Sequence, residues 1–174
     1  MNAPKEVLLR KWQPADASAL STCLNNMNVL KEMPENIPFP YTSRHARVFI
    51  AMTNCCNSMY EKAIEYEGRV VGGISLLSQD ELWAKNAELR FFTGEPFWNR
   101  GIMSKAVEQI VDSAFRHDEF ERIYAYVFEE NHAAISVLRK NGFEKEGLLR
   151  HAALRNHQMH NVCLLSILKP NKTP

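Results

Sequence analysis

FWNRGIMSKA, residues 97–106, joins an apolar, strand-like segment to a strongly amphipathic helix through a short basic turn that contains a glycine. The first amides of a helix have no partner inside it and carry the positive end of its dipole, so an anion placed there meets several N–H donors. Gly101 lets a ligand approach the backbone closely, and Arg100 adds charge. The stretch predicts a binding turn for a pyrophosphate. The alternative is an ordinary surface helix with a glycine in its leading loop.

The helix after the turn is predicted by its apolar periodicity. Apolar side chains recur at spacings of three and four residues: Met103, Ala106, Val107, Ile110, Val111, Ala114 and Phe115. Polar side chains occupy the opposite side, so one face should be buried. Neither the dinucleotide-binding fingerprint nor the Walker-type loop fits, because further glycines and a Gly-Lys-Ser/Thr triplet are missing.

Length and charge narrow the class of protein. The chain has 174 residues and a net charge of +1, so we expect one domain over residues 1–174 and no nucleic-acid partner. No apolar stretch approaches the length that spans a bilayer, and the amino terminus lacks the apolar core of a signal peptide. We therefore expect a cytoplasmic protein with no membrane contact.

The cysteines and histidines do not predict a metal site. The chain has four cysteines: Cys23, Cys55, Cys56 and Cys163. Their spacing is not typical of zinc ligands, and we expect free thiols; a nucleophilic cysteine is the alternative and needs a nearby base. A group of histidines falls near the carboxyl end: His151, His157 and His160. They lack the pair spacing of helical ligands and an evident carboxylate companion.

The remaining elements follow from hydrophobic alternation, caps and turn residues. Strands are expected at residues 7–11, 63–66, 70–77, 86–92, 122–128, 143–149 and 162–168. Besides the helix after the turn, helices are expected from an Asp16 cap through Met27, from Thr42 or Ser43, and from an Asn131 cap to Asn141-Gly142. The order βααβββαβαββ predicts an α/β (α+β) fold with a mixed, mostly antiparallel seven-stranded sheet flanked by helices.

Several short motifs, spread over nearly the whole chain, carry a resemblance to a known family. They are Leu9-Arg10 with Ala15-Asp16, Pro40-Tyr41-Thr42, Ala87-Glu88-Leu89, Trp98-Asn99-Arg100-Gly101, and Asn131 with Lys140-Asn141-Gly142-Phe143. With the order of elements, they resemble the GNAT superfamily of acetyl-CoA-dependent N-acetyltransferases, and within it the Rim-type subfamily, which acetylates the amino termini of ribosomal proteins. The resemblance implies the GNAT fold and acetyl-CoA as cosubstrate.

The resemblance also implies the residues that bind acetyl-CoA. The pyrophosphate turn would comprise Trp98, Asn99, Arg100, Gly101, Ile102, Met103 and Ser104. Only Gly101 matches the family pattern strictly, since Trp98 stands where Gln or Arg is usual and Met103 where Gly or Ala is. Because backbone amides make most of the contacts, a longer side chain is tolerated if it points into the core.

Further contacts to acetyl-CoA are implied on the strands and on the last helix. The pantetheine arm would lie in a splay between residues 89–93 and 124–127, beside Leu89, Phe91 and Phe92. Asn131 would reach the cofactor from the head of the last helix, and is equally expected as an ordinary cap. Lys140 would approach the phosphate end.

For the chemistry, the resemblance implies a glutamate base at Glu88, acting directly or through water. Alternation places Glu88 and Arg90 on the strand face opposite the hydrophobic set. Pairing with Arg90 would lower its proton affinity and make it a positioning group instead. The usual general acid is a tyrosine where this chain has Leu138, so that role is open among Tyr126, Ser136 and His132. Solvent is a further source of the proton.

The sequence gives fewer indications of where the acceptor amine binds. Residues 33–41 are too proline-rich for regular structure yet apolar enough to pack or to line a pocket. We expect Glu32, Phe39, Tyr41 and Glu88 to bind the acceptor, with Glu35 in the same wall, because carboxylates attract a cationic amine. In relatives, the loop predicted here at residues 150–158 borders the acceptor cleft.

The sequence thus predicts an N-acetyltransferase that moves an acetyl group from acetyl-CoA to a primary amine by direct transfer in a ternary complex. The acceptor is a protein amino terminus or a small amine. One alternative is a noncatalytic acyl-CoA-binding or regulatory domain, which the missing tyrosine and the altered turn would fit. Another is a structural or interaction module without a cofactor. Exposed strand edges and residues 37–41 are candidate homodimer contacts, and the oligomeric state is left open.

Overall fold

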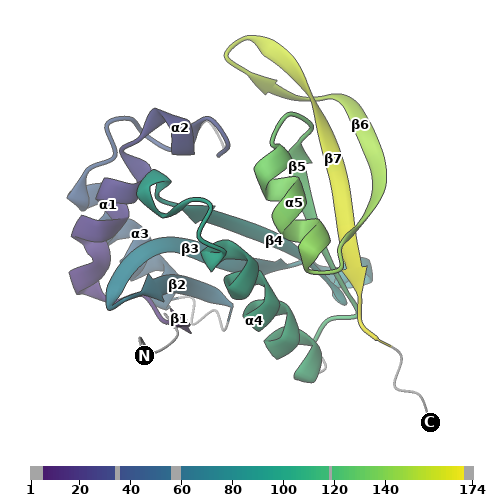
Figure 1. The fold of residues 1–174 in the computed structure, drawn as a ribbon, viewed down its shortest axis with the longest axis horizontal. Helices are drawn as coiled ribbons and strands as arrows, with labels where there is room; N and C mark the ends of the chain where they lie inside the picture. Colours follow the sequence, from purple (N-terminus) through teal and green to yellow (C-terminus); the bar gives the residue numbers. More distant parts are fainter. Residues whose placement is uncertain (1–5, 34–35, 56–59, 118, 171–174) are drawn as a thin grey trace. The chain divides into compact units, whose positions relative to one another are not determined.

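The computed structural model describes residues 6–33, 36–55, 60–117 and 119–170 (Figure 1). The strands are β1 (Val7–Arg10), β2 (Glu61–Tyr66), β3 (Arg69–Ser78), β4 (Asn86–Thr93), β5 (Arg122–Phe128), β6 (Glu144–Arg155) and β7 (Gln158–Leu168). The α-helices are α1 (Ala17–Leu24), α2 (Met27–Leu30), α3 (Ser43–Cys55), α4 (Ile102–Arg116) and α5 (His132–Lys140).

The predicted sheet is confirmed. It has seven strands in the order β1-β2-β3-β4-β5-β7-β6. β4 and β5 are parallel, whereas β1–β2, β2–β3, β5–β7 and β6–β7 are antiparallel pairs. The element order is the expected one with α2 added, because the side chain of Asn26 accepts hydrogen bonds from the Asn28 and Val29 amides and starts a new helical turn. Met27, expected on the buried stripe of the preceding helix, is consequently 60% exposed.

The chain divides into two compact units. Unit 1 comprises Met1–Ser75 and Phe91–Ala106, and unit 2 comprises Leu76–Arg90 and Val107–Pro174. In unit 1, α1 and α3 pack together, and the core cluster includes Trp12, Leu20, Tyr41 and Ile50. The single-domain interpretation stays a prediction.

Asp16 in unit 1 corrects the predicted helix cap. Its side chain makes no capping bond to α1, because a 3₁₀ helix at Pro14–Asp16 already gives Asp16 a helical backbone. The carboxylate instead accepts hydrogen bonds from the Arg10 guanidinium at 2.7 and 2.9 Å and from the Gln13 amide at 2.8 Å. Arg10 Nε also donates to Glu65 Oε2 at 2.6 Å. One arginine therefore joins the end of β1 to β2 and to the approach to α1.

Two glycines of unit 1, Gly72 and Gly73, lie where Phe92 approaches the backbone of β3 closely. A Cβ on Gly72 would lie 2.2 Å from the Phe92 carbonyl oxygen, and a Cβ on Gly73 would lie 2.7 Å from the Phe92 ring. The Phe92 ring also packs against the core cluster of unit 1. The two glycines therefore make room for the last residues of β4 against β3.

In unit 2, β5 has two distinct faces. Ile123, Ala125 and Val127 are buried on one face, while Tyr124, Tyr126 and Phe128 alternate onto the other. The apolar stripe predicted on α4 is buried from Ala106 to Phe115, and Met103 is half-buried. β5 itself has the predicted bounds.

β6 and β7 form a long hairpin, drawn in yellow-green and yellow in Figure 1. The predicted loop at residues 150–158 is therefore wrong, because β6 extends to Arg155 and β7 begins at Gln158. Between them, Asn156 and His157 have φ angles of 47° and 60°, which suit a two-residue hairpin turn. The register shifts between Leu149 and Ala153. There the His151 amide donates to the Asn161 side chain at 3.0 Å.

The described cysteines are free, as predicted: Cys23 and Cys163 are buried and Cys55 is exposed. Cys56 lies outside the described residues. Burial raises the pKa of the Cys23 thiol to about 11, so this thiol stays protonated at neutral pH. In the part of the chain that the structure describes, no helix is both long and apolar enough to cross a membrane.

Candidate active site

The turn before α4 has the backbone of an anion site. Asn99 and Gly101 have φ angles of 58° and 73° and flank Arg100. Such left-handed residues aim successive amides into one concavity, and asparagine and glycine adopt this conformation at the least cost. A Cβ built on Gly101 would meet no atom within 4 Å, so the space beside it is open.

The amides around this turn have no acceptor within the described residues. The Lys105 amide makes the first bond of α4, to the Gly101 carbonyl at 3.2 Å. The amides of residues 99–104 donate to no atom of the described chain. Three of them, at residues 102–104, stand at the positive end of a 15-residue helix. These amides are therefore available to a pyrophosphate. A turn whose amides were already bonded to the protein's own atoms would not be.

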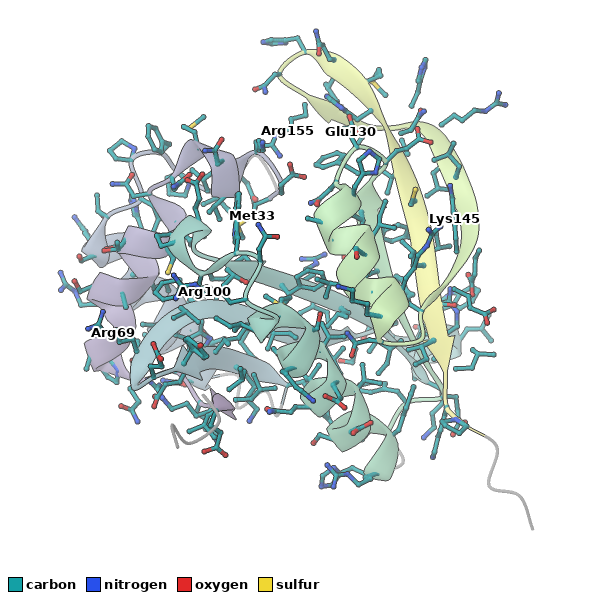
Figure 2. The ribbon with its side chains drawn as sticks, in the orientation of Figure 1. Met33, Arg69, Arg100, Glu130, Lys145 and Arg155 are labelled. Atoms are coloured by element: carbon teal, nitrogen blue, oxygen red, sulfur yellow. The ribbon has the colours of Figure 1, made fainter. Side chains whose placement is uncertain are left out.

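The side chains of the turn hold it in shape. Trp98 Nε1 donates to the Thr93 carbonyl at 2.8 Å. The Arg100 guanidinium carbon lies 5.5 Å from the centroid of the Phe97 ring, and Arg100 is labelled in Figure 2. Ile102 is buried, while Met103 and Ser104 are half-buried. Trp98 therefore braces the turn, and Arg100 remains exposed beside the amides.

The predicted pantetheine contacts on β4 differ in their side chains. Leu89, in unit 2, is 3% exposed. In unit 1, Phe91 is half-buried and the Phe92 ring is taken up by the core cluster. Leu89 and Phe92 can therefore offer a ligand their backbone groups more readily than their side chains.

Glu88 in unit 2 is held by Arg90, so the predicted pair is confirmed. Arg90 Nε donates to Glu88 Oε1 at 2.8 Å, and Arg90 Nη2 donates to Oε2 at 3.0 Å. The Glu88 side chain is 17% exposed and that of Arg90 54%. Across the parallel pair, Glu88 lies in register with Tyr124. Burial, and next the charge of Glu88, raise the pKa of Tyr124. The Tyr124 hydroxyl is thus kept protonated beside a fixed carboxylate.

Tyr126 lies on the same face of β5 as Tyr124. It is 50% exposed, and the two rings meet edge to face with their centroids 5.5 Å apart. At the position of the usual tyrosine acid, Leu138 is fully buried and carries no proton donor. Tyr126 therefore offers an accessible hydroxyl next to Tyr124, which is the register partner of Glu88.

Helix α5 presents the other predicted contacts of unit 2. The Asn131 side chain accepts from the Ala134 amide at 3.0 Å, which confirms its role as a cap. Lys140 lines a hollow of about 390 Å³. The other residues of this hollow are His132, Ile135, Ser136 and Arg139. The predicted acid candidates His132 and Ser136 thus share one helix flank with Lys140.

The predicted acceptor residues of unit 1 have different surroundings. Glu32 and Phe39 are exposed, and Phe39 is 58% exposed. Tyr41 is 7% exposed and belongs to the core cluster, and burial raises its pKa. Glu35 lies outside the described residues. Phe39 can therefore contact a ligand directly, whereas Tyr41 chiefly supports the core.

His160 of the hairpin lies beside a carboxylate. His160 Nδ1 lies 2.6 Å from Glu130 Oε1, and this contact lowers the pKa of Glu130. Figure 2 labels Glu130 and Arg155 near the turn end of the hairpin. Among the described residues, no three histidine, cysteine or acidic side chains stand close enough to hold a metal ion.

The sequence matches the model of the "Acetyltransferase (GNAT) domain" over residues 6–144. The chain belongs to the GNAT acetyltransferase family. The predicted family and enzyme class, an acetyl-CoA-dependent N-acetyltransferase, are thereby confirmed.

Relatives of this GNAT acetyltransferase agree with that assignment. It is 30% identical over 173 residues to the uncharacterized N-acetyltransferase p20 of Bacillus licheniformis, covering 95% of this chain and 94% of the relative. Its fold is similar to that of the ribosomal-protein-S5-alanine acetyltransferase of Vibrio fischeri, with a TM-score of 0.82, 18% identity and coverage of 97% and 96% of the two chains.

A second solved structure has the same fold and a different acceptor. It is the spermidine N-acetyltransferase of Vibrio cholerae in complex with CoA and spermine, with a TM-score of 0.78, 19% identity and coverage of 94% and 95% of the two chains. Relatives with this fold thus act on different amines, so the fold does not define the acceptor of this GNAT acetyltransferase.

The sequence predicted Tyr124 of this GNAT acetyltransferase only as the first residue of the segment 124–127 along the pantetheine arm, and not as the register partner of Glu88. Alternation along β5 places Tyr124 and Tyr126 on one face, which was the available signal. What the sequence lacked was the register of β5 on β4, because the two paired segments lie 36 positions apart along the chain, as the bond from Arg122 to Asn86 shows.

Proposed function

We propose that this GNAT acetyltransferase transfers the acetyl group of acetyl-CoA to a primary amine, and that the turn at residues 98–104 binds the pyrophosphate. The observation that supports this most directly is the set of amides at residues 99–104, which have no acceptor among the described residues. The open space beside Gly101 allows a phosphate to approach them.

Each unit carries proposed cofactor contacts of its own. Unit 1 supplies Trp98, Asn99, Arg100, Gly101, Ile102, Met103 and Ser104, with Phe91 and Phe92. Unit 2 supplies Leu89 on β4, and Asn131 and Lys140 on α5. Backbone groups carry most of these contacts, which explains why Trp98 and Met103 can depart from the family pattern.

Glu88 removes the proton of the attacking amine in the proposed reaction, directly or through one water. We keep this role for Glu88 beside that of a positioning group, because the Arg90 side chain is 54% exposed and water screens its charge. Acetyl-CoA supplies an activated thioester, and the amine must be neutral to attack it. The two bonds from Arg90 hold the Glu88 carboxylate in one orientation. Tyr126 is the proposed donor of the proton to the departing thiolate. Ser136 and His132 are the alternative donors. A thiol of pKa about 8.5 also leaves readily without a dedicated acid.

The acceptor is a protein amino terminus or a small amine. Relatives with this fold act on a ribosomal protein and on spermidine. We propose that Glu32 and Phe39 of unit 1 bind the amine and that Tyr41 supports the core of that unit. Glu88 of unit 2 is a further proposed contact of the amine. A carboxylate attracts an ammonium group, and an exposed aromatic ring packs on the carbon chain that carries it.

The test is release of free thiol from acetyl-CoA in the presence of single amines: a peptide with the amino terminus of a ribosomal protein, spermidine, and free amino acids. Turnover with one class assigns the acceptor. Heat on mixing with CoA but no thiol release with any amine would favour the noncatalytic acyl-CoA-binding alternative. No heat at high CoA concentration would contradict the proposal outright.

Gly101→Ala tests the pyrophosphate turn. We expect the KM for acetyl-CoA to rise about tenfold, because the new Cβ occupies the space beside the amides and strains a residue at φ 73°. Initial rates at varied acetyl-CoA concentration measure the change.

Gly68→Ala is the matched control for this variant. Gly68, in the β2–β3 turn, has a φ angle of 72° and also no atom within 4 Å of a built Cβ. It should lose about as much stability, roughly 1 kcal/mol, and keep the wild-type KM. Equal KM values in the two variants would show that the turn at Gly101 does not contact acetyl-CoA.

A cytoplasmic location and a homodimer complete the proposal. The free thiols of Cys23, Cys55 and Cys163 agree with a reducing compartment. Size-exclusion chromatography with light scattering measures the oligomeric state.

A further inference from the structure

Arg122, the first residue of β5, binds groups on β4, β5 and β6 of unit 2. Its Nη2 and Nε donate to the two oxygens of Glu146 on β6, at 2.6 and 3.3 Å. Its Nη1 donates to Asn86 Oδ1 on β4 at 3.2 Å. Its guanidinium carbon also lies 4.8 Å from the centroid of the Tyr124 ring on β5. Lys145, the residue before Glu146, is labelled in Figure 2 and marks this part of β6.

Glu146 is itself fixed. Ser166 on β7 donates a hydrogen bond to the same carboxylate. The hydrogen bond from Arg122, and next that from Ser166, lower the pKa of Glu146, so the carboxylate stays ionised in the neutral range. A planar guanidinium held by a two-oxygen partner has one orientation, unlike a lysine ammonium. The Asn86 and Tyr124 contacts therefore share one rigid anchor.

This anchor stands at the end of a very short strand pair. The parallel register between β4 and β5 is Asn86↔Arg122, Ala87↔Ile123 and Glu88↔Tyr124, and it stops there. Arg122 and Asn86 form the first pair, and Glu88 and Tyr124 form the last. At the same end, the amides of Glu121 and Arg122 donate to the Lys85 carbonyl at 2.9 and 3.2 Å. The bond from the Arg122 side chain to Asn86 adds to these backbone bonds at the first pair and helps to hold the register.

We propose that Arg122 is a positioning residue for acetyl transfer, which holds Glu88 and Tyr124 in place by clamping Asn86 and the Tyr124 ring to Glu146. The inference rests on the proposed function, since Glu88 must take part in the reaction for its position to matter. It extends the machinery from β4 and β5 to the edge strand β6. A residue 24 positions further along the chain, Glu146, thus acts on the site through Arg122.

Steady-state kinetics of three variants test the proposal: Arg122→Gln, Arg122→Lys and Glu146→Gln. We expect Arg122→Gln to lower kcat about tenfold, because a small displacement of a base costs a large part of its effect. Arg122→Lys should recover part of the loss, since lysine keeps the charge but not the fork or the stacking. Glu146→Gln should lower kcat about threefold, because the contacts to Asn86 and Tyr124 remain.

Lys169→Gln is the matched control. Lys169 Nζ lies 3.8 Å from Glu121 Oε1, so it forms an ion pair with the residue that precedes Arg122. Rates are taken at a temperature where circular dichroism shows every variant folded. If the clamp only stabilises the fold, all variants melt earlier with wild-type kcat, which would overturn the inference. Arg122→Lys and Glu146→Gln decide the question if Arg122→Gln does not fold.

Failure of the proposed function gives a different result. A wild-type protein that releases no thiol with any amine contradicts both statements. Wild-type turnover together with unchanged kcat in the Arg122 and Glu146 variants contradicts the clamp alone.

Discussion

We expect Glu88→Gln to lower kcat for acetyl transfer about 100-fold, the loss typical of removing a positioned general base. Glutamine keeps the shape of the side chain and can accept a hydrogen bond from Arg90, but it cannot take a proton from the amine. The fold should survive, because the Arg90 side chain is 54% exposed and water solvates the charge that loses its partner. Thiol release at saturating substrates, followed over pH 6 to 9, measures the effect.

Glu121→Gln serves as the control for this prediction. Glu121 is an exposed carboxylate in unit 2, 3.8 Å from Lys169 Nζ, and it lies outside the proposed site. It should keep the wild-type kcat. Wild-type turnover by Glu88→Gln would show that another group, or solvent, takes the proton. A higher KM for the amine at unchanged kcat would assign Glu88 to acceptor binding instead.

The second large effect is on stability. We expect Asp16→Asn to lower the free energy of unfolding by about 3 kcal/mol, because it leaves the partly buried Arg10 guanidinium without its main partner. The side chains of Asp16 and Arg10 are 8% and 26% exposed. Asparagine can keep the bond from the Gln13 amide, but it loses the charge and one of the two oxygens that accept from Arg10. Urea unfolding followed by tryptophan fluorescence measures it, with Trp12 buried in the core of unit 1 as a nearby reporter.

The pH dependence of this effect has a definite sign. Burial opposes ionisation of Asp16, but the bonds from Arg10 and Gln13 outweigh it and lower the pKa below the ordinary value. The stabilisation is therefore fully present above about pH 4 and is lost as the pH falls through the lowered pKa. The difference between wild type and Asp16→Asn should be constant from pH 5 to 8 and should shrink toward pH 2.

Glu65→Gln removes the other partner of Arg10 and should cost much less, about 1 kcal/mol, because that side chain is 23% exposed. An equal loss of unfolding free energy in both variants would mean that the two carboxylates contribute equally to the stabilisation by Arg10. It would contradict the assignment of the main role to Asp16.

Local patterns predicted the elements whose partners are close in sequence. The apolar stripe of α4, the bounds of β5 and the Asn131 cap follow from periodicity and caps, and the structure confirms them. The pairing of Glu88 with Arg90 was predictable as well, because alternate residues of a strand share a face. The pyrophosphate turn, which stays a prediction, also rests on a local pattern, because the amides that would bind the ligand are consecutive in the sequence.

Other features depend on partners that the sequence does not place. The sequence around Asp16 predicts a helix cap, but in the structure Asp16 binds Arg10, which lies at the end of β1. The turn at Asn156-His157 lacks the glycine that marks most two-residue hairpin turns, so the hairpin was interpreted as a loop. From the sequence, Arg122 is only a polar residue at the start of a predicted strand. Its bonds to Asn86 and Glu146 could not be predicted, because they depend on the strand order β4-β5-β7-β6.

The irregularity between Leu149 and Ala153 bears on how the protein behaves when concentrated. β6 ends the sheet, and it carries exposed apolar side chains at Leu148, Leu149 and Leu154. A long, straight border of that kind invites foreign strands to add to it and to seed aggregates. The irregularity at His151 divides the border into two shorter runs, which interrupts the template for such growth. We therefore expect this break in the β6–β7 ladder to reduce strand addition at the edge of the sheet.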